Sequence, residues 1–188
     1  MRGDGEGFGW REDLASGRAV TVRRARPEDG ERIERMHARS SPESRYQRYF
    51  TPMNEWREDN LRRISGGHRG ATLVVTDVLE EVVALGNVFP TGPVDADRAE
   101  IALIVDEAWH GLGVGFLLTG HLIDVARRLG FTRLVAYVLA ENRAMLHLLE
   151  QSPLDWTVTT DHDLGTSVVC LTARLDASSV VADFRAEN

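Results

Sequence analysis

The chain has 188 residues, 43% hydrophobic and 27% charged, a composition typical of one soluble globular domain. Its formal net charge of -7 argues against nucleic acid or an anionic membrane as the main partner, and no apolar run is long enough to cross a bilayer. The single cysteine, Cys170, excludes an internal disulfide, and the first residues have no hydrophobic signal core, so we expect a cytoplasmic protein.

We expect three segments along the chain. Residues 1–18 are rich in glycine and charge and are expected to form a flexible N-terminal arm without a functional role. One folded domain is expected over residues 19–176, and residues 177–188 form a C-terminal tail.

Two helices are predicted after a short strand at residues 20–22. The first starts at Pro27 with an acidic first turn, and it places His37 on its apolar face. There the histidine is interpreted as a packed core residue rather than a base. The second helix begins at Glu43, and Asn54 is predicted to cap a continuation. Its larger side chains recur at helical spacing and are Tyr46, Tyr49, Phe50 and Met53.

From residue 71 onwards the spacing of the hydrophobic residues becomes that of β-strands. Residues 73–79 and 82–89 predict a hairpin that turns at Glu80 and Glu81. A loop follows, and Glu100 then precedes a short buried strand at residues 101–105.

Three glycines follow that strand at alternate positions. They are Gly111, Gly113 and Gly115. Apolar residues then recur at helical spacing until Gly130, so this stretch predicts a strand, a glycine loop and a helix. The unpaired N–H groups at such a helix start favour a phosphate or pyrophosphate. The P-loop pattern is excluded because the chain has no lysine, and the dinucleotide pattern G-x-G-x-x-G is excluded because the third glycine comes one residue early.

The C-terminal third predicts a strand, a short helix and two more strands. The strands cover residues 133–138, 156–160 and 167–172, and Asn142 caps the helix over residues 142–150. The complete element order predicts one mixed sheet with helices on both faces.

The segment His110-Gly-Leu-Gly-Val-Gly115 resembles the R/Q-x-x-G-x-G/A acyl-CoA loop of the GNAT superfamily of N-acetyltransferases. Together with the opening TVRRARPED and with Glu141-Asn142 before a short helix, the resemblance covers roughly residues 20–175. His110 departs from the usual Arg or Gln, which weakens one side-chain contact. Two segments, SPESRYQRYF and ENRAM, are similar to those of bacterial Pat-type protein lysine acetyltransferases.

The resemblance implies an α/β GNAT (acyl-CoA N-acyltransferase) fold, with a mixed central sheet flanked by helices on both faces. It implies acetyl-CoA as the acyl-donor co-substrate, no metal, and transfer of the acetyl group to a primary amine. A protein lysine, for example in an acyl-CoA synthetase, is the favoured acceptor, and the enzyme is expected to be a monomer or homodimer. A small-molecule amine acetyltransferase and a catalytically silent acyl-CoA-binding module stay open as alternatives.

The resemblance also implies which residues contact the coenzyme. Backbone N–H groups near Ile104 or Val105 are expected to stabilise the oxyanion. Asn142 either bonds the pantetheine arm or acts as a plain helix cap. The full expected set is Leu103, Ile104, Val105, His110, Gly111, Leu112, Gly113, Val114, Gly115, Phe116, Asn142 and Met145.

Glu100 is the predicted general base. It precedes a buried strand, where desolvation raises the pKa of a carboxyl, and Pat-like enzymes place a glutamate in the corresponding region. Asp97 and Asp106 are the reserve bases. No general acid is assigned, because the position at which many GNAT enzymes carry a tyrosine is Leu149 here. The tyrosines that could substitute are Tyr46, Tyr49 and Tyr137.

Overall fold

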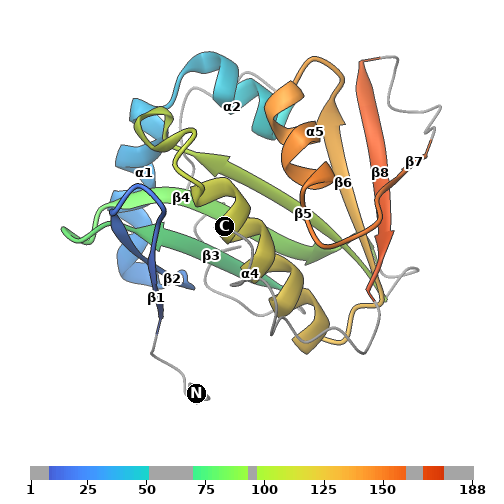
Figure 1. Ribbon diagram of the computed structural model, residues 1–188, viewed down its shortest axis with the longest axis horizontal. Coiled ribbons are helices and arrows are strands. Elements are labelled where there is room, and N and C mark those ends of the chain that lie inside the picture. The colour runs from blue at the N-terminus through green and yellow to red at the C-terminus, as the bar shows by residue number, and fades with distance from the viewer. Residues whose placement is uncertain (1–8, 51–69, 93–96, 160–166, 176–188) are drawn as a thin grey trace.

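The computed structural model describes residues 9–50, 70–92, 97–159 and 167–175 (Figure 1). The strands are β1 (Trp10–Asp13), β2 (Ala19–Arg24), β3 (Ala71–Thr76), β4 (Val82–Pro90), β5 (Arg98–Val105), β6 (Arg133–Leu139), β7 (Thr157–Thr159) and β8 (Val168–Arg174). The helices are α1 (Gly30–Arg39), α2 (Pro42–Tyr49), α4 (Val114–Arg128) and α5 (Arg143–Glu150), with short 3-10 helices η1 (Pro27–Asp29) and η2 (Glu107–Trp109).

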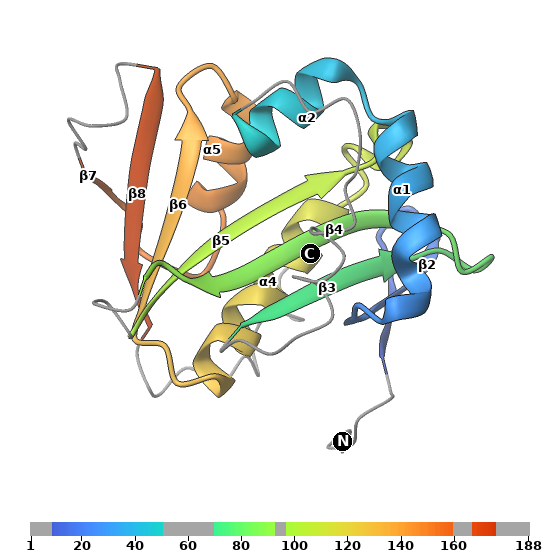
Figure 2. The same cartoon turned by 180° about the vertical axis from the view of Figure 1, so that it is seen from behind.

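The strands form one sheet in the order β1-β2-β3-β4-β5-β6-β8-β7. Neighbouring strands are antiparallel except for β5 and β6, which run parallel. Helices α4 and α5 cover one face of the sheet, and α1 and α2 lie on the other face (Figures 1 and 2). The predicted mixed sheet with helices on both faces is therefore confirmed.

Strand β1 lies in the segment that we expected to be a flexible arm. It pairs antiparallel with β2, with Trp10 opposite Val22, and the Trp10 ring lies 4.9 Å from the ring of His121 on α4. A four-residue stretch with three charged side chains has little strand character of its own, so pairing and packing on α4 determine this strand. Residues 1–8 of the expected arm and the expected tail over 177–188 lie outside the described residues.

Helix α2 is shorter than predicted. It begins at Pro42, where Ser41 Oγ accepts a hydrogen bond from the backbone N–H of Ser44 at 3.1 Å. It ends before Phe50, whose φ of 56° is left-handed and closes the helix. Met53 and the predicted continuation after Asn54 lie outside the described residues.

The β3–β4 turn begins earlier than predicted. Asp77 Oδ1 accepts hydrogen bonds from the backbone N–H groups of Leu79 and Glu81, both at 2.9 Å, so the turn spans residues 77–81. The prediction that the strand extends to Leu79 is wrong, because the aspartate side chain binds backbone groups that a strand would pair.

The larger core lies between the sheet and helices α4 and α5. Leu118, Leu122 and Ile123 of α4 are fully buried there. Gly86 of β4 allows α4 to pack closely, since a Cβ at that position would lie 2.8 Å from a methyl group of Leu122. A smaller core forms on the other face, where Ile33 and Met36 of α1 pack against the sheet.

A buried ion pair fixes the start of α1 against β2. Arg23 donates to both carboxylate oxygens of Asp29, at 2.6 and 2.7 Å, and Asp29 also accepts from the backbone N–H of Arg26 at 2.7 Å. His37 is 5% exposed, which confirms its prediction as a packed residue.

The parallel strands β5 and β6 pair only at their beginnings. Their register joins residues 98–100 to residues 133–135, and no pairs follow. Beyond Glu100 the two strands diverge, as Figure 1 shows between the yellow-green and orange strands. The sheet is therefore split between its two halves at the ends of β5 and β6.

Among the described residues, no helix has the length and apolar character that crossing a membrane requires. These residues also hold no group of three or more His, Cys, Asp or Glu side chains arranged to bind a metal ion.

Candidate active site

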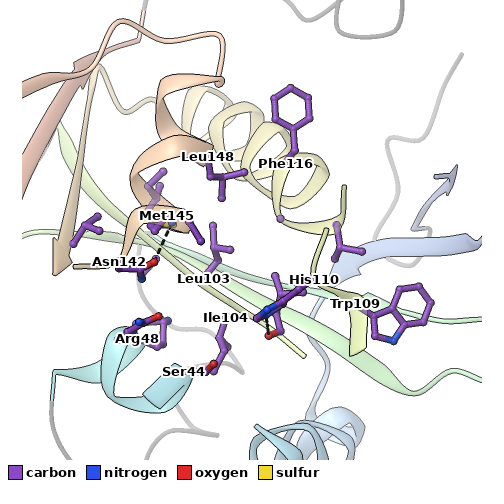
Figure 3. Close-up of a pocket in the computed structure, with 18 of the residues that line it drawn as sticks. Ser44, Arg48, Leu103, Ile104, Trp109, His110, Phe116, Asn142, Met145 and Leu148 are labelled. Carbon is purple, nitrogen blue, oxygen red and sulfur yellow. Dashed lines mark hydrogen bonds between the residues drawn. The ribbon is translucent and has the colours of Figure 1, made fainter. Parts of the chain in front are cut away.

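A cavity of about 370 Å³ occupies the split between β5 and β6. Its walls come from β5, β6, the glycine loop, α5 and one side of α2 (Figure 3). The cavity thus connects the N-terminus of α4 with α2, which lies on the opposite face of the sheet (Figure 2).

The glycine loop forms the end of the cavity at α4. Gly111 and Gly113 have φ values of 70° and 88°, a left-handed conformation that side chains with a Cβ rarely adopt. Gly113 is the N-cap residue of α4, and the first intrahelical hydrogen bond runs from the N–H of Leu117 to its carbonyl. The N–H groups of Val114 and Gly115 precede this bond at the open N-terminus of α4, and no acidic side chain occupies the first turn. This geometry and charge suit an anion such as a pyrophosphate.

Two carboxylates lie immediately before this loop, and both are directed away from it. Asp106 pairs with Arg39 of α1 at 2.9 Å. Glu107 accepts hydrogen bonds from the backbone N–H of Ser41 and the hydroxyl of Ser44, at 2.8 and 2.7 Å. Burial disfavours ionisation of Glu107, but these hydrogen bonds outweigh it and hold its pKa at about 2. The charge of Asp106 is thus paired with Arg39, and the ionised Glu107 is held by neutral hydrogen-bond donors on the α1–α2 side.

His110 connects the glycine loop to the end of β5. Its Nε2 donates to the backbone carbonyl of Val105 at 2.9 Å, as the dashed line in Figure 3 shows. The side chain therefore satisfies a carbonyl beyond the point where β5 loses its neighbour β6.

Apolar side chains and one amide line the middle of the cavity. Leu103 of β5 faces Met145 and Leu148 of α5 in Figure 3. Asn142 Oδ1 accepts a hydrogen bond from the backbone N–H of Met145 at 3.0 Å, so Asn142 is a cap of α5. Since its oxygen serves the cap, its amide N–H₂ group is the part that can donate to a ligand.

Glu100 lies on the opposite face of β5 from the side chains that pack on α4. Ile101 and Leu103 belong to the α4-side core, whereas Ile104 packs against α1, so the alternation of the strand directs Glu100 toward the α1–α2 side. Burial raises its pKa, and the positive charge of Arg48 partly opposes this shift. A half-buried carboxylate with a raised pKa is suited to accept a proton.

Arg48 of α2 lines the cavity, and its charge also acts on the carboxylate of Glu100. It was not identified as a site residue from the sequence. It lines the cavity beside Ser44, lies over the ring of Tyr49 at 4.8 Å, and donates to Asn87 Oδ1 on β4. Asn87 in turn donates to Thr72 Oγ1 at 2.8 Å. One sequence signal could have indicated Arg48: it directly precedes Tyr49 in a helix that Ser41 caps, within a segment similar to that of Pat-type enzymes.

Both reserve bases are held in other interactions. Asp97 binds Arg133 and the hydroxyl of Thr132, and these hydrogen bonds hold its pKa at about 2, which makes it a poor base. Asp106 binds Arg39 and caps η2 by accepting from the N–H of Ala108 at 3.0 Å.

Of the three tyrosines, Tyr137 lines the cavity. The hydroxyl of Tyr49 instead lies 2.9 Å from Nε2 of His37, and Tyr46 is 43% exposed. Leu149 is fully buried in the core, so the last helix offers no acid at that position.

The cavity brings together most of the residues expected to contact a coenzyme. Leu112 does not line it and packs against the core, and Glu100 lies near it without lining it. The residues that do line it are Leu103, Ile104, Val105, His110, Gly111, Gly113, Val114, Gly115, Phe116, Asn142 and Met145.

Known proteins are similar to this chain in sequence and in fold. A family model described as "Acetyltransferase (GNAT) family" matches residues 31–152. Acetyltransferase PA5475 of Pseudomonas aeruginosa is 32% identical over 167 residues, which cover 87% of this chain and 89% of that protein. The crystal structure of the GNAT domain of S. lividans PAT superposes with a TM-score of 0.81 and 26% identity, covering 92% of this chain and 100% of that chain. The structure of yncA from Salmonella typhimurium with its cofactor acetyl-CoA has a TM-score of 0.65 and 19% identity, covering 87% and 96% of the two chains.

Proposed function

The chain belongs to the GNAT family of acetyltransferases, and we propose that the amine to which it transfers the acetyl group of acetyl-CoA is a lysine of a protein. Transfer of acetyl from acetyl-CoA to an amine is the activity of the family. The choice of a protein lysine, the placement of the coenzyme and the roles of individual residues are the proposal.

The observation that carries the lysine acceptor is the position of α2. Residues 41–50, whose sequence is similar to that of Pat-type protein lysine acetyltransferases, form this helix and its caps. Ser44, Gln47 and Arg48 of the same segment line the cavity. One of the two segments that are similar to Pat-type enzymes thus borders the cavity on the α2 side, where we place the acceptor. The likeness to the whole GNAT domain of S. lividans PAT supports the same choice.

The glycine loop and β5 are proposed to hold the coenzyme. Backbone N–H groups at the N-terminus of α4 bind the pyrophosphate, and the split between β5 and β6 receives the pantetheine arm between Leu103 and Met145. Asn142 donates to this arm from its amide. When bound, acetyl-CoA supplies a thioester carbonyl that an amine can attack.

Glu100 is proposed to accept the proton of the incoming ammonium group, directly or through water. A lysine ammonium has an unperturbed pKa of about 10.4, so nearly every turnover at neutral pH needs such an acceptor. Backbone N–H groups near Ile104 and Val105 donate to the oxyanion that develops on the thioester carbonyl. The positive charge of Arg48 limits how far the pKa of Glu100 rises.

Thiol release from acetyl-CoA tests the acceptor class. Two acceptor pools are compared, purified acyl-CoA synthetases and a panel of small amines, and acetyl-lysine is located by mass spectrometry. We expect thiol release with the proteins and acetyl groups on their lysines. Because the chain contains no lysine, acetyl-lysine in the tag-free reaction comes from the acceptor.

Two outcomes would overturn the proposal. Efficient acetylation of small amines without any protein modification would assign a small-molecule acceptor. Binding of acetyl-CoA without turnover on either pool would assign a silent acyl-CoA-binding module.

A further inference from the structure

The segment that builds the coenzyme loop carries no strong cation. Residues 99–126 contain neither arginine nor lysine, and the side chain of His110 is bound to the carbonyl of Val105. Within this segment, backbone N–H groups are therefore the donors available to a pyrophosphate. Coenzyme A carries one further phosphate, on the ribose 3′-oxygen, and a phosphate monoester has a charge of about -1.5 to -2 near pH 7. Any strong cation that binds this group therefore comes from another part of the chain.

Arg18 is a cation that the fold brings to the loop. It lies between β1 and β2, and its guanidinium carbon is 4.9 Å from the centre of the Trp109 ring. Trp109 belongs to η2, directly before the glycine loop, and it lines the cavity. Stacking on an aromatic ring restricts the arginine side chain while its N–H groups remain available for a ligand.

No acidic partner neutralises Arg18 among the described residues. Its side chain is exposed and makes neither an ion pair nor a hydrogen bond with any of them. Other arginines near this end of the sheet differ, since Arg35 pairs with Glu81 and Arg39 with Asp106. The two carboxylates closest in sequence to the loop, Asp106 and Glu107, are bound on the α1–α2 side.

We propose that Arg18 binds the ribose 3′-phosphate of coenzyme A, next to the glycine loop that holds the pyrophosphate. This inference rests on the use of acetyl-CoA by the family, and it adds a binding residue from outside the glycine loop. Arg18, the last residue of the arm that we expected to have no function, thereby contributes to recognition of the coenzyme. Arg18 distinguishes coenzyme A from its 3′-dephospho form.

Calorimetric titration with two ligands and two variants tests this assignment. The ligands are coenzyme A and 3′-dephospho-coenzyme A, and the variants are Arg18→Met and Arg128→Met. Arg128 is a matched control because it is exposed and lies in the last turn of α4, at the other end of the same helix. We expect Arg18→Met to weaken coenzyme A binding about 3- to 10-fold, as suits an exposed charge-assisted contact. Binding of the dephospho ligand should not change, and Arg128→Met should bind both ligands as the wild type does.

The dephospho ligand also reports on folding. If Arg18→Met binds it with wild-type affinity, the variant is folded and its loss for coenzyme A is specific to the 3′-phosphate. An equal loss for both ligands would overturn the assignment and place Arg18 on the pyrophosphate or on the fold. Unchanged affinity for coenzyme A would also overturn it. A wild-type protein that binds neither ligand would instead refute the coenzyme site itself.

Discussion

Replacing Glu100 with glutamine tests the proposed base directly. Glutamine has nearly the same shape and cannot accept the proton, so turnover at pH 7 should fall by about 10² to 10⁴, the usual contribution of general-base catalysis. This corresponds to about 3–5 kcal/mol of activation free energy. Coenzyme affinity should be retained, because Glu100 does not line the cavity beside the glycine loop.

The loss should depend on pH in a defined way. With a lysine pKa of about 10.4, the neutral fraction of the acceptor rises about a hundredfold between pH 7 and pH 9. At higher pH more of the amine is already deprotonated and needs no general base, so the loss of turnover in Glu100→Gln should be smaller at pH 9 than at pH 7. Thiol release at saturating acetyl-CoA measures turnover at each pH, and calorimetry measures coenzyme binding.

The same substitution should also affect stability. Because burial raises the pKa of Glu100, the folded protein holds this proton more tightly than the unfolded chain does. Ionisation of Glu100 therefore lowers stability as pH rises through its folded pKa, and a neutral glutamine avoids that loss. We expect Glu100→Gln to unfold at an equal or higher temperature at pH 7. Unchanged turnover at pH 7 with a proven acceptor would refute the assignment, and lost coenzyme binding would show a structural role.

Three other substitutions have expected outcomes. Gly113→Val should abolish thermal stabilisation by acetyl-CoA, because φ is 88° there and a β-branched side chain would stand at the N-terminus of α4. Gly92→Val is the control, since a Cβ at that position outside the cavity would meet nothing within 4 Å, and stabilisation retained in Gly113→Val would contradict the anion site. Arg48→Met should move the acidic limb of the pH–rate profile to higher pH, because burial of Glu100 is then unopposed; a limb that stays in place would show that Arg48 does not act on the base. Asp29→Ala should lower the free energy of unfolding by about 3–5 kcal/mol, because it leaves the buried Arg23 charge uncompensated; a loss below about 1 kcal/mol in denaturant titration would contradict the importance of this pair.

The strand, glycine loop and helix could be predicted because each depends on nearby residues. Buried β-branched residues define β5, and the apolar spacing after Val114 defines α4. Gly113 was recognisable because its conformation is local. Such elements carry their own signal, and the structure places them within a few residues of their predicted bounds.

Features that depend on distant contacts could not be predicted. β1 exists because it pairs with β2 and packs on α4, and its own residues do not favour a strand. The positions of Arg48 beside Glu100 and of Arg18 over Trp109 follow from how helices and turns meet across the sheet. The raised pKa of Glu100 could be anticipated from its burial, but the charge of Arg48, which lowers that pKa, could not.

The split between β5 and β6 leaves a place in the sheet where a bound ligand could stabilise the fold. A continuous parallel pair would have satisfied its own backbone groups, whereas here the pairing stops after Glu100 and Val135. A ligand that lies in the gap takes the place of the missing neighbour, and it binds the folded chain alone. Its effect on the folding equilibrium grows as RT ln(1 + [L]/Kd), about 2.7 kcal/mol at a hundredfold excess over Kd. Acetyl-CoA, which we propose to lie in this gap, should therefore raise the unfolding temperature of the protein as its concentration exceeds Kd.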